Sequence, residues 1–333
     1  MEEPTAPELI PNTYQDLSAH FRKPGKTNQF QFRKETFARI EQLTKRSLIC
    51  YVTKTHNTSP AHATAIDDSD LTGFQDLCIT TPGDEVDVLV ISNGGSAEAA
   101  ERIVRLLREK YKNIRFILPA NAYSAATLLS FSGNSIIMGS LATLGPIDPQ
   151  INGVPARAIL RAFEEVTARL KKEGPQALPA YMPLISKYDL HIFEICKSAQ
   201  ALSNELAASW LSAYMLECEQ TDQRVTSAVD FFSNYDLHKS HGRSVSRTKA
   251  RELLGEKVIF SEDIPGLSDL LRSLYNQYEL WFDSTPFFKL FENARGINWG
   301  RQSALPIQIP FQFPMPGIPF PIGPLPLPQP PGQ

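Results

Sequence analysis

Residues 86–130 read VDVLVISNGGSAEAAERIVRLLREKYKNIRFILPANAYSAATLLS and decide the fold. The short apolar runs Val86–Ile91 and Ile114–Leu118 are typical of buried strands. Between them, apolar residues recur at the spacing of one buried helix face: Ala100, Ile103, Val104, Leu107 and Tyr111. A strand, a helix of this length and a second strand predict a right-handed crossover between parallel strands.

The pattern continues on both sides of this stretch. Upstream, a helix over Glu35–Arg46 leads into an apolar strand at Ser47–Val52, and a short helix follows around Ser69–Leu77. Downstream, Ser124–Ser132 reads as a helix of small residues and Ser135–Met138 as a further strand. Strands that alternate with helices predict an α/β fold with a largely parallel sheet and ligand sites at the carboxyl ends of the strands.

The second half of the chain is predicted to be mainly helical. Periodic apolar residues favour helices over five segments: 156–172, 189–218, 225–232, 247–254 and 267–291. The long segment 189–218 carries the apolar residues Phe193, Leu206, Trp210 and Tyr214, from which we expect a homo-oligomer. Packing within one chain is the competing interpretation of these residues.

Composition divides the chain into three parts. Residues 1–27 form a polar extension, residues 28–295 the domain, and residues 296–333 a proline-rich tail. From Ser303 onward there is no charged residue, and eleven of the 26 prolines of the chain lie there. Because proline removes backbone donors, we expect a polyproline-like or disordered tail, suited to a proline-recognising partner.

Charge and cysteine content exclude several classes of protein. With 33 basic and 36 acidic residues, the chain lacks the excess of positive charge that is typical of proteins that bind nucleic acid or anionic membranes. The four cysteines form no CxxC pair, so we expect neither a metal site nor a disulfide scaffold. The amino-terminal sequence resembles no signal peptide, and no apolar stretch reaches membrane-spanning length. We therefore expect a cytoplasmic protein without an integral membrane segment.

Two elements follow predicted strands and carry chemistry. The pair Gly94-Gly95 can present backbone N–H groups to an oxyanion, although a tight strand-to-helix turn would also need glycine. Ser96 suits the N-cap of the following helix. Ser124 lies at a strand-to-helix junction among small residues, where the helix N-terminus would favour an alkoxide. A capping serine is the alternative interpretation of Ser124.

In order and spacing, five segments resemble the Clp-protease/crotonase superfamily, and most closely its serine-dehydrogenase-proteinase branch, which is related to signal peptide peptidase A: VDVLVISNGG, AEAAERIVRLLREKY, IRFILPANAYSAATLLS, NSIIMG and ATLGPIDPQI. The resemblance implies a Clp-protease/crotonase-like fold with repeated β-β-α units. It also implies that Ser124 is the nucleophile and that the Gly94-Gly95 turn and Ala125 form the oxyanion hole, through the N–H groups of Gly95 and Ala125. One departure is Ala126, where the family usually has glycine.

The general base is the missing partner. None of the six histidines lies in the loop that follows the nucleophile, so a Clp-type triad is not expected. Asp148 lies there instead, in a segment that also reads as a rigid turn, and His241 is the remaining imidazole candidate or a surface residue. The resemblance to signal peptide peptidase implies a lysine base, for which Lys187 is the best candidate. Its alternative is a solvated lysine at a helix start.

These observations predict a serine peptidase that cleaves peptide or protein substrates through an acyl-enzyme on Ser124, with Lys187 as general base. Two alternatives stay open: an inactive peptide-binding scaffold, and a crotonase-like enzyme for acyl-CoA thioesters. The latter needs no serine nucleophile, and no basic cluster for CoA phosphates is apparent. We expect no cofactor, because no pyridoxal-phosphate lysine motif and no GxGxxG turn occurs.

Overall fold

The computed structural model describes residues 10–303, except for residues 24, 26–27, 57–60, 190 and 217–220. The proline-rich tail beyond residue 303 and Cys218 lie outside the described residues. The cysteines Cys50, Cys78 and Cys196 are free and buried. None of the described helices combines the length and apolar character needed to cross a membrane. The described part of the chain also contains no cluster of three metal-ligating side chains.

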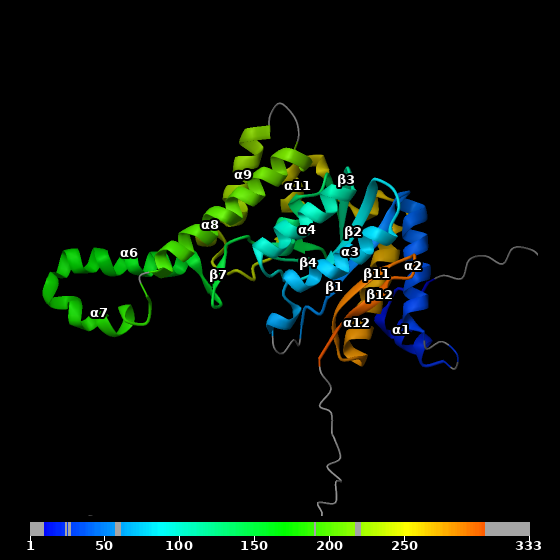
Figure 1. Ribbon diagram of the computed structural model, residues 1–333, viewed down its shortest axis with the longest axis horizontal. Coiled ribbons are helices and arrows are strands. Elements are labelled where there is room, and N and C mark those ends of the chain that lie inside the picture. The colour runs from blue at the N-terminus through cyan, green and yellow to red at the C-terminus, as the bar shows by residue number, and fades with distance from the viewer. Residues whose placement is uncertain are drawn as a thin grey trace, which may run out of the picture. The chain divides into compact units, whose positions relative to one another are not determined.

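A seven-stranded sheet lies at the centre of the described residues (Figure 1). Its strands follow the spatial order β10 (Val258–Phe260), β5 (Ser135–Met138), β3 (Asn113–Leu118), β2 (Glu85–Ile91), β1 (Ser47–Thr53), β11 (Phe287–Asn293) and β12 (Asn298–Gln302). The first five are parallel, whereas β11 is antiparallel to β1 and β12 to β11. The predicted α/β class with a largely parallel sheet is therefore confirmed.

Helices cover both faces of the sheet, which explains why its strands read as continuous apolar runs. One face packs against α3 (Leu71–Thr80), α4 (Ala97–Lys110) and α5 (Ala125–Phe131), and the other against α2 (Gln29–Thr44) and α12 (Leu267–Ser284). Successive residues of β2 contribute to opposite cores, with Val88 and Val90 on the α4 side and Leu89 and Ile91 on the α12 side. This alternation is that of a strand buried on both faces.

The carboxyl-terminal end of the domain differs from the sequence prediction. The sequence predicts a helix over 267–291, but α12 ends at Ser284, and the residues from Phe287 onward form β11. Pro286 stops the helix because proline cannot continue the backbone ladder. In β11, Leu290 faces the α12 core while Phe291 faces the α3 core, so the strand is buried on both sides. The strand β12 lies beyond residue 295, the boundary drawn from composition.

The amino-terminal extension contains a helix. It is α1 (Tyr14–Phe21), and its Leu17 is completely buried. The Tyr14 hydroxyl donates to an Asp283 carboxylate oxygen at 2.9 Å, and Ser273 Oγ donates to the Pro11 carbonyl at 2.5 Å. Because Asp283 and Ser273 belong to α12, this helix is attached to the α12 side of the sheet.

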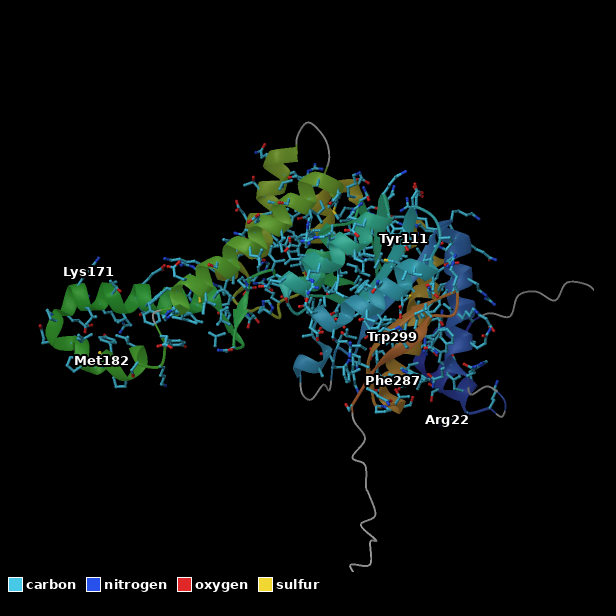
Figure 2. The ribbon with its side chains drawn as sticks, in the orientation of Figure 1. Arg22, Tyr111, Lys171, Met182, Phe287 and Trp299 are labelled. Atoms are coloured by element: carbon cyan, nitrogen blue, oxygen red, sulfur yellow. The ribbon has the colours of Figure 1, made fainter. Side chains whose placement is uncertain are left out.

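Two helices form an arm that extends away from the sheet (Figure 1). They are α6 (Ala156–Glu173) and α7 (Leu178–Ile185), and Figure 2 shows Lys171 and Met182 along them. The chain returns to the sheet through α8 (His191–Trp210) and a π-helical turn at Leu211–Met215. Leu206 and Trp210 on α8 are buried in the core, so they are not available to a partner. The homo-oligomer stays a prediction.

Short elements complete the fold near the carboxyl ends of the strands. A three-stranded sheet contains β4 (Asn121–Ala122), β6 (Thr143–Leu144) and β9 (Val245–Ser246), and a hairpin contains β7 (Gln150–Ile151) and β8 (Val154–Pro155). The helices α9 (Thr221–Ser233), α10 (Tyr235–His238) and α11 (Arg247–Leu254) lie between α8 and β10 in the chain. The succession β3, β4, α5 has the predicted β-β-α order.

Candidate active site

Ser124 has a backbone conformation that is uncommon for a residue with a side chain. Its φ of 52° and ψ of −120° are a strained combination that glycine normally adopts, at a cost of about 1–3 kcal/mol. It stands at the sharp turn between β4 and α5, and its hydroxyl makes no N-cap hydrogen bond. Ser96, by contrast, caps α4 as predicted, since its Oγ accepts from the Ala99 N–H at 3.0 Å. Helix capping therefore does not explain Ser124.

A cavity of about 590 Å³ opens beside Ser124. Its lining includes all the residues expected to stabilise an oxyanion, Gly94, Gly95 and Ala125, and also His241. Apolar side chains supply much of the remaining wall: Ala97, Leu128, Ile147, Ile151 and Leu202. A concave, mostly apolar site with few converging polar groups is typical of a substrate pocket.

The Gly94-Gly95 turn packs too closely against Ser124 and Ile66 to carry side chains. Gly94 has a φ of +94°, and a Cβ there would lie 2.4 Å from the Tyr123 carbonyl oxygen and 2.7 Å from Ser124 Cβ. A Cβ on Gly95 would lie 2.3 Å from the backbone N and O of Ile66. The same geometry thus fits both interpretations of the glycine pair, a tight strand-to-helix turn and a turn that presents N–H groups to an oxyanion.

Backbone hydrogen bonds determine which N–H groups are available. The Gly94 N–H donates to Ser92 Oγ at 3.1 Å, and the Gly94 carbonyl accepts from the Ile66 N–H at 2.9 Å. A trans peptide unit directs its C=O and N–H in opposite directions, so the Gly95 N–H points away from Ile66. In the part of the chain that the structure describes, no hydrogen bond uses the Gly95 or Ala125 N–H. These two donors are the candidates for the oxyanion hole.

An imidazole–carboxylate pair lies at the same cavity. His241 Nδ1 is 2.9 Å from Asp148 Oδ1. The Asp148 side chain is 2% exposed and that of His241 is 24% exposed. In the neutral tautomer that carries its proton on Nδ1, this N–H donates a hydrogen bond to the carboxylate and Nε2 is an acceptor. The second oxygen of Asp148, Oδ2, is buried and has no hydrogen-bond partner among the described residues.

Strand pairing explains how residues 93 positions apart meet. β6 pairs with β9 so that Thr143 is opposite Ser246 and Leu144 is opposite Val245. The segment just before β9 carries His241, and the loop just after β6 carries Asp148. Antiparallel pairing places these two neighbouring segments at the same end of the ribbon.

The loop after β6 is held from both sides. The Ile147 N–H donates to the Phe232 carbonyl at 2.8 Å, and the Ile147 carbonyl accepts from Ser203 Oγ at 2.7 Å. On the α5 side, Thr127 Oγ1 lies 3.0 Å from both the N and the O of Gly145 and donates to the Ala122 carbonyl at 2.7 Å. Asp148 is thereby fixed relative to the helix that begins after the nucleophile.

Thr127→Val is expected to lower the free energy of unfolding by about 1–3 kcal/mol, because it keeps the shape, removes the hydroxyl that contacts the Gly145 carbonyl and leaves the Gly145 N–H only its 3.3 Å bond to the Ala122 carbonyl. Chemical denaturation measures the change. Ser130→Ala is the matched control: its hydroxyl is also buried in α5 but donates only to Ala126 of the same helix. Equal losses in the two variants would contradict the role assigned to Thr127.

A second histidine lies near Asp148 and is kept neutral. His238 is 4% exposed, and its Nε2 is 2.8 Å from the Phe231 carbonyl oxygen. Burial lowers the pKa of His238 below its ordinary value, although the Phe231 hydrogen bond and the nearby Asp148 charge oppose this effect. Burial thus favours the neutral form of His238, and the imidazole that is hydrogen-bonded to Asp148 is that of His241.

The structure does not bring Lys187 to the nucleophile. Lys187 is exposed and follows α7 at the end of the arm, and it is not among the residues that line the cavity. Its neighbour Tyr188 is also exposed, at 42%. Of the predicted site residues, the structure gathers Gly94, Gly95, Ser124, Ala125 and His241 around the cavity, with Asp148 bonded to His241.

Sequence reasoning missed the segment that supports the oxyanion turn. Ile66 forms an isolated parallel bridge with Gly95, and its neighbour Ala65 lines the cavity. Nothing in the local sequence marks this contact, because it depends on a polar loop meeting a turn some thirty positions later. The pairing of Asp148 with His241 had a weak signal, since Asp148 lies in a segment that resembles the peptidase family and His241 was the remaining imidazole candidate.

Residues 60–175 match a family described as ClpP-like SDH-type serine proteinase. The matched segment contains Gly95, Ser124 and Asp148 and ends before His241. Two uncharacterized proteins of Methanocaldococcus jannaschii are similar to the chain. One is 28% identical over 144 residues, covering 41% of this chain and 49% of the relative. The other is 36% identical over 80 residues, covering 24% of this chain and 28% of the relative.

The chain thus spans about half the length of the first of these curated relatives and 28% of the second. Among solved structures, ClpP1 from Listeria monocytogenes aligns with a TM-score of 0.39 at 10% identity, over 67% of this chain and 95% of that chain. The 1510-N membrane-bound stomatin-specific protease aligns with a TM-score of 0.34 at 16% identity, over 59% of this chain and 74% of that one. The match over residues 60–175 supports the resemblance of this segment to the ClpP-like SDH-type serine proteinases.

Proposed function

We propose that the chain is a serine peptidase that hydrolyses peptide bonds through an acyl-enzyme on Ser124, with His241 as general base and Asp148 as the residue that orients it. One observation carries the proposal: His241, bonded through Nδ1 to a buried carboxylate, lines the same cavity as a serine held in a strained turn. Nucleophile, base and orienting acid are the residue types of a catalytic triad, and the cavity that Ser124 and His241 share supports these roles.

Each group has a defined part in the reaction. Ser124 Oγ attacks the substrate carbonyl carbon while His241 Nε2 accepts the hydroxyl proton. The carbonyl oxygen becomes an oxyanion that accepts hydrogen bonds from the Gly95 and Ala125 N–H groups. The carbon–nitrogen bond then breaks, and the leaving amine takes the proton from Nε2. A water molecule repeats the sequence on the ester, which releases the carboxylate product and returns the proton to Ser124.

The position of Ser124 supports this reaction energetically. The nucleophile precedes the first turn of α5, where unpaired backbone N–H groups favour negative charge. The Asp148 carboxylate is almost fully buried, so its attraction for the imidazolium formed during attack is only weakly screened.

A fluorophosphonate probe tests the proposal directly. The expected result is one covalent adduct per chain, and peptide mass spectrometry should locate it on Ser124. The Lys187→Ala variant is expected to react at the wild-type rate, because Lys187 does not line the cavity. A folded protein that does not react would favour the alternative function, an inactive peptide-binding scaffold. An adduct on another serine would contradict the assignment of the nucleophile.

Gly94→Ala is expected to slow probe labelling by about 10²-fold or more while the protein stays folded. The new Cβ would separate the glycine turn from Ser124 and move the Gly95 donor, and loss of one such donor costs on the order of 10²–10³ in rate. Gly296→Ala is the matched control, since Gly296 has a φ of +111° and a Cβ added there would meet nothing within 4 Å. Similar labelling rates in both variants would exclude a role for the Gly94 contact.

A further inference from the structure

A buried lysine lies behind the oxyanion turn, and the proposed mechanism does not use it. Lys289 is on β11, and its side chain is 0% exposed. Its Nζ donates to the Ala65 carbonyl at 2.6 Å and to the two Asp70 carboxylate oxygens at 2.9 and 3.0 Å. It also lies 3.2 Å from Asp67 Oδ2. One ammonium group therefore ties a strand of the central sheet to both ends of the loop 65–70.

Asp70 is held on its other side as well. The Tyr51 hydroxyl donates to Asp70 Oδ2 at 2.7 Å, and the Asp67 N–H donates to the same oxygen at 3.1 Å. Burial raises the pKa of Asp70, and the charge of Lys289 opposes that rise. Burial also raises the pKa of Tyr51 well above its ordinary value, so that its hydroxyl keeps the proton it donates.

The loop that Lys289 holds determines the direction of the Gly95 N–H. The Ile66 N–H donates to the Gly94 carbonyl, and the Ser96 N–H donates to the Ile66 carbonyl, both at 2.9 Å. The first bond fixes the peptide plane that contains the Gly95 N–H, and the second fixes the next plane. Ile66 follows Ala65, whose carbonyl accepts from Lys289. A continuous series of hydrogen bonds thus connects the ammonium to the oxyanion donor.

A buried ion pair is weak evidence of stabilisation, because desolvation offsets much of its attraction. We propose that Lys289, with Asp70, is a positioning residue that holds the loop 65–70 against Gly94 and so keeps the Gly95 N–H directed at the oxyanion. This inference rests on the proposed function of Ser124. It assigns a catalytic consequence to a residue that does not touch the substrate.

The same strand offers a matched control. Glu292, on the opposite face of β11, forms a pair with Arg33 of α2 in which both side chains are 0% exposed and Nη2 is 2.6 Å from Oε1. This pair faces the α12 side of the sheet and has no contact with the loop 65–70. The double variants Lys289→Met/Asp70→Asn and Arg33→Met/Glu292→Gln each remove one buried ion pair without leaving a fully buried isolated charge. The first also deprives Asp67 of its contact with Lys289, but the Asp67 side chain is 47% exposed.

The test measures the rate of fluorophosphonate labelling at saturation, the concentration of half-maximal rate, and the hydrogen exchange of the Ile66 amide. In the folded Lys289→Met/Asp70→Asn variant we expect a saturating rate about 10²-fold lower, an unchanged half-maximal concentration and loss of Ile66 protection. The folded Arg33→Met/Glu292→Gln variant should keep the wild-type saturating rate, half-maximal concentration and Ile66 protection.

Three results would overturn the inference: wild-type labelling and Ile66 protection in the Lys289 variant, equal losses in both double variants, or a change in half-maximal concentration alone. If the Lys289 variant does not fold, Tyr51→Phe, which removes one hydrogen bond to Asp70, must lower the saturating rate and the protection together. If the wild-type protein itself does not react, the proposed function fails. Ile66 exchange then still shows whether Lys289 positions the loop.

Discussion

Ser124→Ala is expected to lower the turnover number for a peptide substrate by on the order of 10⁶, leaving the small residual rate that binding and the oxyanion donors provide. The fold should be unaffected, because the Ser124 hydroxyl makes no capping bond. Turnover of a fluorogenic peptide library, followed by circular dichroism of each protein, measures both properties. Activity that survives in Ser124→Ala would show that another residue is the nucleophile.

The backbone of Ser124 gives this prediction a second readout. Ser124→Gly should be as inactive as Ser124→Ala yet more stable, because glycine adopts a φ of 52° and a ψ of −120° without the strain of a side chain. The expected gain in unfolding free energy is about 1 kcal/mol or more over the alanine variant. Equal stability of the two variants would mean that the turn stores no strain.

His241→Ala is expected to reduce turnover about as much as Ser124→Ala, since members of a triad act as a unit and their losses do not add. Asp148→Asn should lower the turnover number by roughly 10⁴-fold, because an amide holds the imidazole in the wrong tautomer. Added imidazole should partly restore the His241→Ala enzyme and leave Ser124→Ala inactive. The measurement is the rate with each variant, with and without imidazole.

Lys187→Ala is the control that separates the two candidate bases. It should retain wild-type turnover, because the side chain is exposed and lies outside the cavity. An inactive but folded Lys187→Ala protein, together with an active His241→Ala protein, would return the base to lysine. Loss of activity in both would require a movement of the arm toward the cavity.

Local patterns predicted most of the sheet and the place of Ser124 at a strand-to-helix junction. The apolar run of β2 and the periodic face of α4 are independent of distant residues, and Ser124 with Gly95 lies at strand ends where a parallel sheet places its sites. β11 was missed because its apolar residues continue the helical pattern of α12, and only Pro286 separates the two. Strand and helix are hard to distinguish in short apolar runs that are buried on both sides.

The base could not be predicted from local sequence. Whether Lys187 is desolvated depends on where the arm lies, and the arm is built from residues that precede and follow it by tens of positions. His241 meets Asp148, and so becomes the proposed base, only because β9 pairs with β6, a contact between segments about one hundred residues apart. The local sequence His241-Gly242-Arg243 does not predict that pairing.

The pairing of β9 with β6 also sets the moment at which the site is complete during synthesis. Gly95, Ser124, Ala125 and Asp148 are all synthesised before His241, which follows Asp148 by 93 residues. At about 5–20 residues per second, roughly 5–20 s separate the synthesis of Asp148 from that of its partner His241. The intervening residues build the arm and α8, α9 and α10. Under the proposed mechanism, the growing chain is inactive toward neighbouring nascent chains until its own core has been synthesised.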